Sequence, residues 1–133
     1  MLRPAIAADL PALVAIRDHS GADALSDPAR VHEALLCRLI DSAAVVAWDD
    51  EGVSGFAATD GAVVHLLVDS ALRGGGIGRA LLDWACAAVR EAGHAAAIVT
   101  LTPGSTAERH YRAAGWVSIE AGAEGHRVFQ KPL

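Results

Sequence analysis

The chain has 133 residues, of which 53% are hydrophobic and 5% aromatic, and a formal net charge of −5 at pH 7. This composition is typical of one globular domain, expected to span residues 1–133, and it excludes a disordered segment. No apolar run approaches the ~20 residues of a membrane span, no signal-peptide pattern is seen, and no basic stripe marks a nucleic-acid surface. We therefore expect a cytoplasmic protein that binds neither membranes nor nucleic acids.

The first half of the chain predicts a strand, two helices and then three strands. Asp9 and Asp27 precede the helical patterns as capping residues, and Pro28 suits a first helical position. The turn signals "DDEG" and "DG" separate the strands and favour antiparallel hairpins. The expected strands are 2–7, 43–48, 53–59 and 62–68, and the expected helices begin near residues 10 and 28.

The second half predicts a long helix, a strand, a short helix and a final hairpin. The long helix runs from about Ile77 to Ala92 and ends at Gly93. Ser105 and Glu108 fit a capping box that starts the short helix, which Gly115 closes. The expected strands are 95–101, 116–121 and 127–131. The full order is β-α-α-β-β-β-α-β-α-β-β.

Neither the cysteines nor the histidines show metal-ligand spacing, so we expect no metal site. Cys37 and Cys86 lie in separate helical patterns and are expected to be reduced thiols of the core. The three tryptophans are expected to pack in the core or at its edge; they are Trp48, Trp84 and Trp116.

The stretch "LRGGGIGRALL", residues 72–82, places four glycines between a strand and a helix. The first N–H groups of a helix have no helical partners, and glycines let a phosphate approach the backbone, so this junction predicts an anion site. A P-loop would need Gly-Lys-Ser/Thr, but the chain has Gly78-Arg79-Ala80, and Leu81 replaces the third glycine of a dinucleotide fingerprint. A plain glycine-rich connection needs only one or two glycines.

One further motif fits completely. Residues 73–78, "RGGGIG", match R/Q-x-x-G-x-G/A, and "AERHYRAAGW" follows downstream. With the opening "LRPAIAADLPALVAI", the chain resembles the GNAT (Gcn5-related N-acetyltransferase) family over nearly its whole length. The resemblance implies an α/β fold: a mixed, mostly antiparallel sheet of about seven strands flanked by about four helices. It also implies an enzyme that moves an acetyl group from acetyl-CoA to a primary amine of a small molecule or peptide, as a monomer or homodimer.

The resemblance implies a set of cofactor-binding residues on the strand, the loop and the last helix. Tyr111, four residues after Ala107, falls at the family's tyrosine, whose implied role is to protonate the leaving thiolate; the alternative is that its ring only packs. The other implied contacts to coenzyme A come from Leu66, Leu67, Val68, Arg73, Gly74, Gly75, Gly76, Ile77, Gly78, Arg79, Thr102 and Ala107.

The chain departs from the family pattern at two kinds of position. Gly104 stands where the family often has Asn, and Ala62 and Val64 stand where it often has a catalytic base. His65 is next to that place, but strand alternation points it to the other face unless a bulge re-aims it. Other weak candidates for the base are Asp23, Asp60 and Glu120. Two alternatives stay open: a non-catalytic acyl-CoA binder and an unrelated nucleotide-binding domain.

Overall fold

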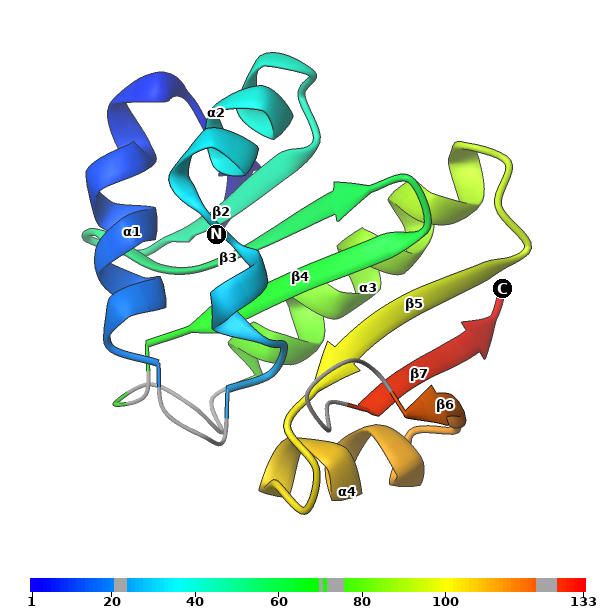
Figure 1. Cartoon of the computed structure of the whole chain (residues 1–133). Coiled ribbons are helices and arrows are strands. Elements are labelled where there is room, and N and C mark those ends of the chain that lie inside the picture. The colour runs from blue at the N-terminus through cyan, green and yellow to red at the C-terminus, as the bar shows by residue number, and fades with distance from the viewer. Residues whose placement is uncertain (21–23, 70, 72–75, 122–126) are drawn as a thin grey trace.

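A computed structural model describes residues 1–20, 24–69, 71, 76–121 and 127–133, with the side chains of residues 120 and 121 excepted. Helices and strands alternate along the described chain in the predicted order (Figure 1). They are β1 (Leu2–Pro4), the 3-10 helix η1 (Ala7–Asp9), α1 (Leu10–Asp18), the 3-10 helix η2 (Pro28–Arg30), α2 (Glu33–Asp41), β2 (Val45–Asp49), β3 (Val53–Asp60), β4 (Val63–Val68), α3 (Ile77–Glu91), β5 (Ala96–Leu101), α4 (Thr106–Ala113), β6 (Val117–Ala121) and β7 (Arg127–Pro132).

The strands form one seven-stranded sheet in the order β1-β2-β3-β4-β5-β7-β6. Every neighbouring pair is antiparallel except β4 and β5, which run parallel. The predicted mixed, mostly antiparallel α/β fold is therefore confirmed. The parallel pair needs a crossover, and α3 provides it between the two strands.

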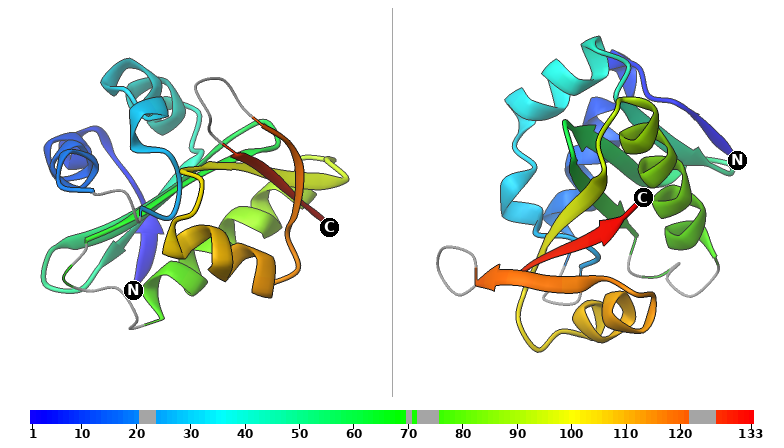
Figure 2. Two further views of the ribbon diagram at one scale, coloured as in Figure 1. Left: turned by 60° about the horizontal axis from the view of Figure 1, so that its bottom comes forward. Right: turned by 90° about the vertical axis from the view of Figure 1, so that its right-hand side faces the viewer.

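Helices cover both faces of the sheet, and each face has its own core (Figure 2). Helices α1 and α2 bury Leu13, Leu36 and Leu67 with their neighbours on one face. Helices α3 and α4 bury Leu81 and Tyr111 with theirs on the other. The alternation of strand side chains between the two faces explains why Leu66 and Leu67 belong to different cores.

The long helix α3 approaches the sheet closely at Gly55 of β3. A Cβ atom built on Gly55 would lie 3.1 Å from Leu81 Cδ1 and 3.2 Å from the carbonyl oxygen of Leu67. Both distances are tighter than ordinary contacts, so a side chain here would push α3 and β4 apart. Glycine at this position sets the depth at which α3 packs.

Two predictions about the N-terminal elements were wrong in their bounds. The second α-helix begins at Glu33 rather than at Pro28, because Pro28–Arg30 form a separate 3-10 turn capped by Asp27. His32 then caps α2, with its Nδ1 accepting the Leu35 N–H at 3.1 Å. Strand β1 ends at Pro4, before the turn of η1.

Helix α4 begins as predicted, but its glutamate has a different partner. Ser105 is the N-cap and accepts the N–H of Glu108 at 3.2 Å. The Glu108 carboxylate accepts the N–H of Gly104 instead of that of Ser105, and it pairs with Arg112 and Arg127 at 3.2 and 3.1 Å. These hydrogen bonds, chiefly the one from Gly104, hold the pKa of the carboxyl below its usual range. Glu108 thus ties α4 to the start of β7.

The cysteine prediction was half right. Both thiols are free, but Cys37 is exposed on α2 and only Cys86 is partly buried. The tryptophans pack as predicted, with Trp116 buried and Trp48 and Trp84 half-buried.

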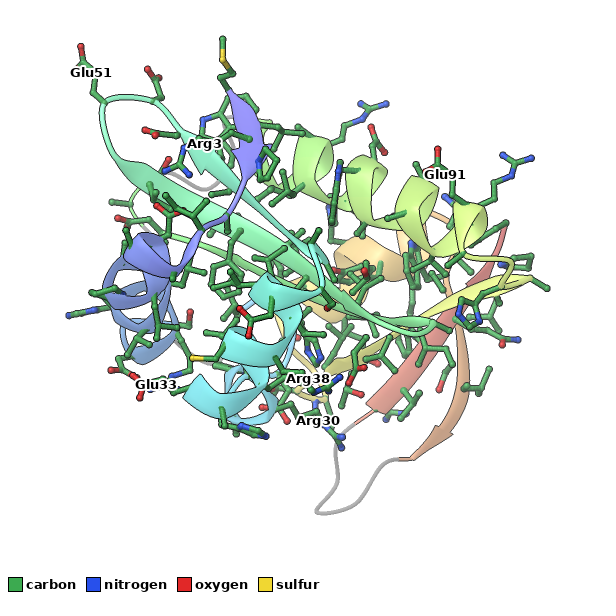
Figure 3. The ribbon with its side chains drawn as sticks, turned by 90° about the horizontal axis from the view of Figure 1, so that it is seen from above. Arg3, Arg30, Glu33, Arg38, Glu51 and Glu91 are labelled. Carbon is green, nitrogen blue, oxygen red and sulfur yellow. The ribbon has the colours of Figure 1, made fainter. Side chains whose placement is uncertain are left out.

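Charged groups tie the first strand to its surroundings at the surface (Figure 3). The Arg3 guanidinium donates to both carboxylate oxygens of Asp9 at 2.8 Å and to Asp49 at 2.9 Å. These hydrogen bonds lower the pKa of Asp9 below its usual value. Among the described residues, none of the helices is both long and apolar enough to cross a membrane.

Candidate functional site

The candidate site lies where the two parallel strands part. Strands β4 and β5 share the register pair Val63↔Ile98, and the Ile98 N–H donates to the Ala62 carbonyl at 2.9 Å. Beyond this pair, the segment that joins α1 to α2 lies between the two strands. Its described part next to α2, residues 24–32, is called the connector below. The N–H of Asp27 donates to the Thr100 carbonyl of β5 at 2.9 Å.

The same connector bonds the facing edge of β4. The Ser26 hydroxyl accepts the Leu66 N–H at 2.9 Å and donates to the Leu66 carbonyl at 3.1 Å. Ser26 is 2% exposed, so these bonds are shielded from water. One hydroxyl thereby satisfies both main-chain groups that Leu66 turns toward β5, as a paired strand would.

The connector also passes from one face of the sheet to the other at this gap. Ala24 packs in the core beneath α1 and α2, whereas Leu25 packs against the core beneath α3 and α4. The gap between β4 and β5 is therefore filled by protein, and the side chain of Leu25 forms part of a hollow on the α3 and α4 face.

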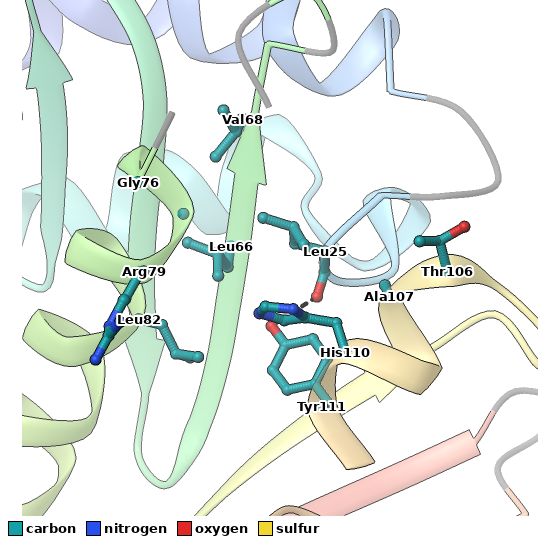
Figure 4. Close-up of a pocket in the computed structure, with 11 residues that line it drawn as sticks. Leu25, Leu66, Val68, Gly76, Arg79, Leu82, Thr106, Ala107, His110 and Tyr111 are labelled. Carbon is teal, nitrogen blue, oxygen red and sulfur yellow. Dashed lines mark hydrogen bonds between the residues drawn. The ribbon is translucent and has the colours of Figure 1, made fainter. Parts of the chain in front are cut away.

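That hollow is a pocket of about 590 Å³ between β4, α3 and α4 (Figure 4). Its wall is mostly apolar, with the polar groups of Arg79, Thr106, His110 and Tyr111 set into it, which is the usual character of a small-molecule site. The lining residues are Leu25, Leu66, Val68, Gly76, Gly78, Arg79, Leu82, Thr106, Ala107, His110 and Tyr111.

Tyr111 stands at the inner end of this pocket. Its side chain is fully buried, its ring packs edge-on against Trp116 with 5.1 Å between centroids, and its hydroxyl donates to the Leu25 carbonyl at 2.8 Å. Burial raises the pKa of the phenol well above its ordinary value of about 10. The hydroxyl therefore keeps its proton at neutral pH and is available as a proton donor.

The start of α3 forms the opposite wall. Gly76 is the N-cap of α3 and has a φ of +85°, a left-handed conformation that L side chains rarely adopt. A Cβ atom on Gly78 would lie 2.9 Å from Leu25 Cδ1, so glycine here leaves room for the connector. The first N–H groups of a helix have no partners within it, and Gly76, Gly78 and Arg79 line the pocket at this end of α3, a place suited to an anion.

The structure brings together most of the described residues that the sequence predicted for coenzyme A. Leu66, Val68, Gly76, Gly78, Arg79, Ala107 and Tyr111 line the pocket. Ile77, Leu67 and Thr102 do not: Ile77 is half-buried at the start of α3, Leu67 points to the α1 and α2 face, and Thr102 follows β5. The predicted contacts of Arg73, Gly74 and Gly75 lie outside the described residues.

Four lining residues were missed by sequence reasoning: Leu25, Leu82, Thr106 and His110. Thr106 and His110 are four residues apart and adjoin Ala107 and Tyr111, so the helical period could have identified them as one face. His110 is next to Tyr111 in the sequence, and both line the pocket, with 6.1 Å between their ring centroids.

The candidates for a base do not meet in the pocket. The β3–β4 register runs without a bulge, so His65 stays on the α1 and α2 face, where burial lowers the pKa of its imidazole. Asp60 pairs with Arg38 at 3.2 Å on the surface. Asp23 and the side chain of Glu120 lie outside the described parts.

A second hollow, of about 860 Å³, continues from the pocket along the outer side of α3 and α4. It shares Arg79, Leu82 and His110 with the pocket, and it adds the cations Arg90 and Lys131. In the described part of the chain, no group of three or more His, Cys, Asp or Glu side chains lies close enough to hold a metal ion.

At this site a parallel strand pair parts around a filled gap, with a helix N-terminus on one side and a buried tyrosine on the other. A model of the acetyltransferase (GNAT) domain matches residues 21–128. The chain belongs to the GNAT family, and the predicted family is confirmed.

Solved structures with the same fold cover the whole chain. Ard1 from Thermoplasma volcanium is 17% identical, with a TM-score of 0.78 over 97% of that protein. The PaiA N-acetyltransferase of Thermoplasma acidophilum, solved with coenzyme A, is 13% identical, with a TM-score of 0.77 over 98%. A phosphinothricin acetyltransferase of Sinorhizobium meliloti, solved with acetyl-CoA, is 24% identical, with a TM-score of 0.76 over 88%. A search of curated protein sequences finds no significant match.

Proposed function

We propose that the protein is an N-acetyltransferase that moves an acetyl group from acetyl-CoA to a primary amine, by direct attack in a ternary complex. The observation that carries this proposal is the position of Tyr111. Its protonated hydroxyl stands in the pocket between β4 and α4, opposite the N-terminus of α3. A cofactor whose phosphates lie at that helix end extends its thioester toward this hydroxyl.

The cofactor lies with its pyrophosphate at the loop of residues 73–78 and the first turn of α3. Unpaired amide groups at a helix N-terminus attract phosphate, and Arg79 adds a positive charge at the pocket wall. The pantetheine arm runs along β4. It pairs with the outward main-chain groups of Val68, because Ser26 already bonds those of Leu66.

The chemistry needs one new carbon–nitrogen bond, one broken carbon–sulfur bond and three proton movements. The neutral amine nitrogen bonds to the thioester carbon, the carbon–sulfur bond breaks, and the Tyr111 proton goes to the leaving sulfur. The proton lost by the new amide nitrogen passes to solvent, and solvent restores the phenol, so the products are the acetylated amine and free coenzyme A. General acid catalysis of this kind typically contributes ~10²–10⁴-fold.

Release of free thiol from acetyl-CoA tests the activity directly. The acceptor panel contains a polyamine, an aminoglycoside, free amino acids and a peptide with a free α-amino group. We expect amine-dependent thiol release by the wild type, and a kcat lower by ~10²–10⁴-fold in Tyr111→Phe with acetyl-CoA affinity retained.

Ser42→Ala is the matched control, because Ser42 is exposed at the end of α2 and bonds only the carbonyls of its own helix. Its kcat should equal that of the wild type. Binding of acetyl-CoA without thiol release on any amine would show a binder instead of an enzyme. A kcat of Tyr111→Phe within a few-fold of wild type, with chemistry rate-limiting, would make the tyrosine a packing residue.

A further inference from the structure

The Leu25 carbonyl has one hydrogen-bond donor among the described residues, and that donor is the hydroxyl that the proposed reaction requires elsewhere. The Tyr111 hydroxyl oxygen lies 2.8 Å from the Leu25 oxygen. A hydroxyl carries one proton and donates one hydrogen bond. When that proton turns toward the thioester sulfur, the Leu25 carbonyl loses its partner.

The carbonyl cannot readily move to find another donor, because the residues on its C-terminal side are fixed. Ser26 is bonded to both main-chain groups of Leu66, and Asp27 is bonded through its N–H to Thr100. The connector is thus held from β4 and from β5 at once. An unpaired carbonyl here costs free energy, and because Leu25 is half-buried and lines the pocket, a donor that enters the pocket can take the place of the hydroxyl.

The acceptor amine is the donor that arrives at this point of the reaction. Leu25 lines the pocket beside Tyr111, and an attacking NH₂ group has two N–H bonds besides its lone pair (Figure 4). One N–H pointing at a fixed carbonyl orients the lone pair toward the thioester carbon. Holding two reactants in one geometry is a large part of catalysis in ternary complexes.

We infer that the main-chain carbonyl of Leu25 is the amine-binding group of this site and exchanges the Tyr111 hydroxyl of the free protein for an amine N–H in the ternary complex. This inference rests on the proposed function.

The exchange predicts an effect on amine binding that would not occur if the Tyr111 ring only packed in the core. In the wild type, an amine has to displace the hydroxyl from the carbonyl, whereas in Tyr111→Phe the carbonyl is free. We expect 2,2,2-trifluoroethylamine, a weakly basic primary amine that is uncharged at pH 8, to bind Tyr111→Phe about 3- to 10-fold more tightly than the wild type, the equivalent of one net neutral hydrogen bond. Binding is measured by NMR titration with a non-reactive thioether analogue of acetyl-CoA at saturation.

An ester bond between residues 25 and 26 tests the carbonyl itself. Cys37 is exposed and free, so a synthetic segment 1–36 can be joined to 37–133 by native chemical ligation. Replacing Ser26 by its α-hydroxy acid keeps the hydroxymethyl side chain and makes the Leu25 carbonyl a weaker acceptor. In the Tyr111→Phe background, the ester should abolish the 3- to 10-fold gain, and the all-amide ligated protein is the control.

Equal or weaker trifluoroethylamine binding by Tyr111→Phe would overturn the inference. So would an ester that weakens binding of the thioether analogue and leaves trifluoroethylamine binding unchanged, since the carbonyl would then serve the cofactor arm. These readouts need no turnover. A protein that releases no thiol from acetyl-CoA but shows both binding effects would disprove the proposed activity and leave the amine site standing.

Discussion

The buried phenol of Tyr111 should make the fold sensitive to alkaline pH. Tyr111 is the one tyrosine of the chain, its side chain is fully buried, and its hydroxyl donates to the Leu25 carbonyl. Burial raises its pKa in the folded protein, whereas in the unfolded chain it ionises near pH ~10. Above that pH the unfolded state loses a proton that the folded state keeps, so the free energy of unfolding falls as the pH rises.

The size of the effect follows from this difference of one proton. Above pH ~10, the free energy of unfolding should fall by up to about 1.4 kcal/mol for each pH unit. The total stability of a domain is about 5–15 kcal/mol. Urea unfolding at pH 7 and in steps between pH 9.5 and 11.5 measures it. Phenolate absorbance near 295 nm reports this residue alone, since tryptophan does not ionise in this range, and we expect it to appear together with unfolding.

Tyr111→Phe is the matched control for this titration. At pH 7 the variant should be less stable by about 1–3 kcal/mol, because the Leu25 carbonyl loses its donor. Its further loss of stability above pH 10 should be smaller than that of the wild type. The partly buried Cys86 thiol, whose pKa burial also raises, contributes to both proteins. A phenolate that forms near pH 10 in a protein that is still folded would refute the reasoning.

Three further predictions concern the loop, the first strand and the buried histidine. Gly76→Val should weaken acetyl-CoA binding at least ~10-fold, and by more than Arg79→Ala does, because a side chain at Gly76 both strains the left-handed φ and intrudes on the phosphate. Calorimetry measures the two affinities, and equal losses would show that charge holds the cofactor. Asp9→Asn should lower Tm by about 3–6 °C at pH 7, and unchanged melting would contradict this. The deficit should shrink as the pH falls below ~4, because the unfolded carboxylate takes up a proton there and the folded one, bound to Arg3, does so only at lower pH. Burial lowers the pKa of His65, so the wild type should lose stability as the pH falls below ~6.5, and His65→Gln should flatten that loss in urea titrations at pH 5–7.

Local patterns in the sequence determined most of the secondary structure and the family. Short apolar runs separated by turn residues indicated β3 and β4, the Ser105 cap indicated the start of α4, and the glycines before Ile77 indicated the junction that becomes the N-terminus of α3. These signals work because they depend on residues a few positions apart, whose side chains meet in any chain with that backbone. The predicted start of α2 was wrong for the same reason, since a cap at Asp27 looks alike before a 3-10 turn and before an α-helix.

The tertiary structure alone decided how the site is closed. Tyr111 and Leu25 are 86 residues apart, and Ser26 and Leu66 are 40 apart. No local spacing encodes those contacts, because they form only when β4 and β5 part and the connector enters between them. The sequence placed a tyrosine on the right helix, but its hydrogen-bond partner is a main-chain carbonyl. Every residue has such a carbonyl, so only the packing of the strands could select the one at Leu25.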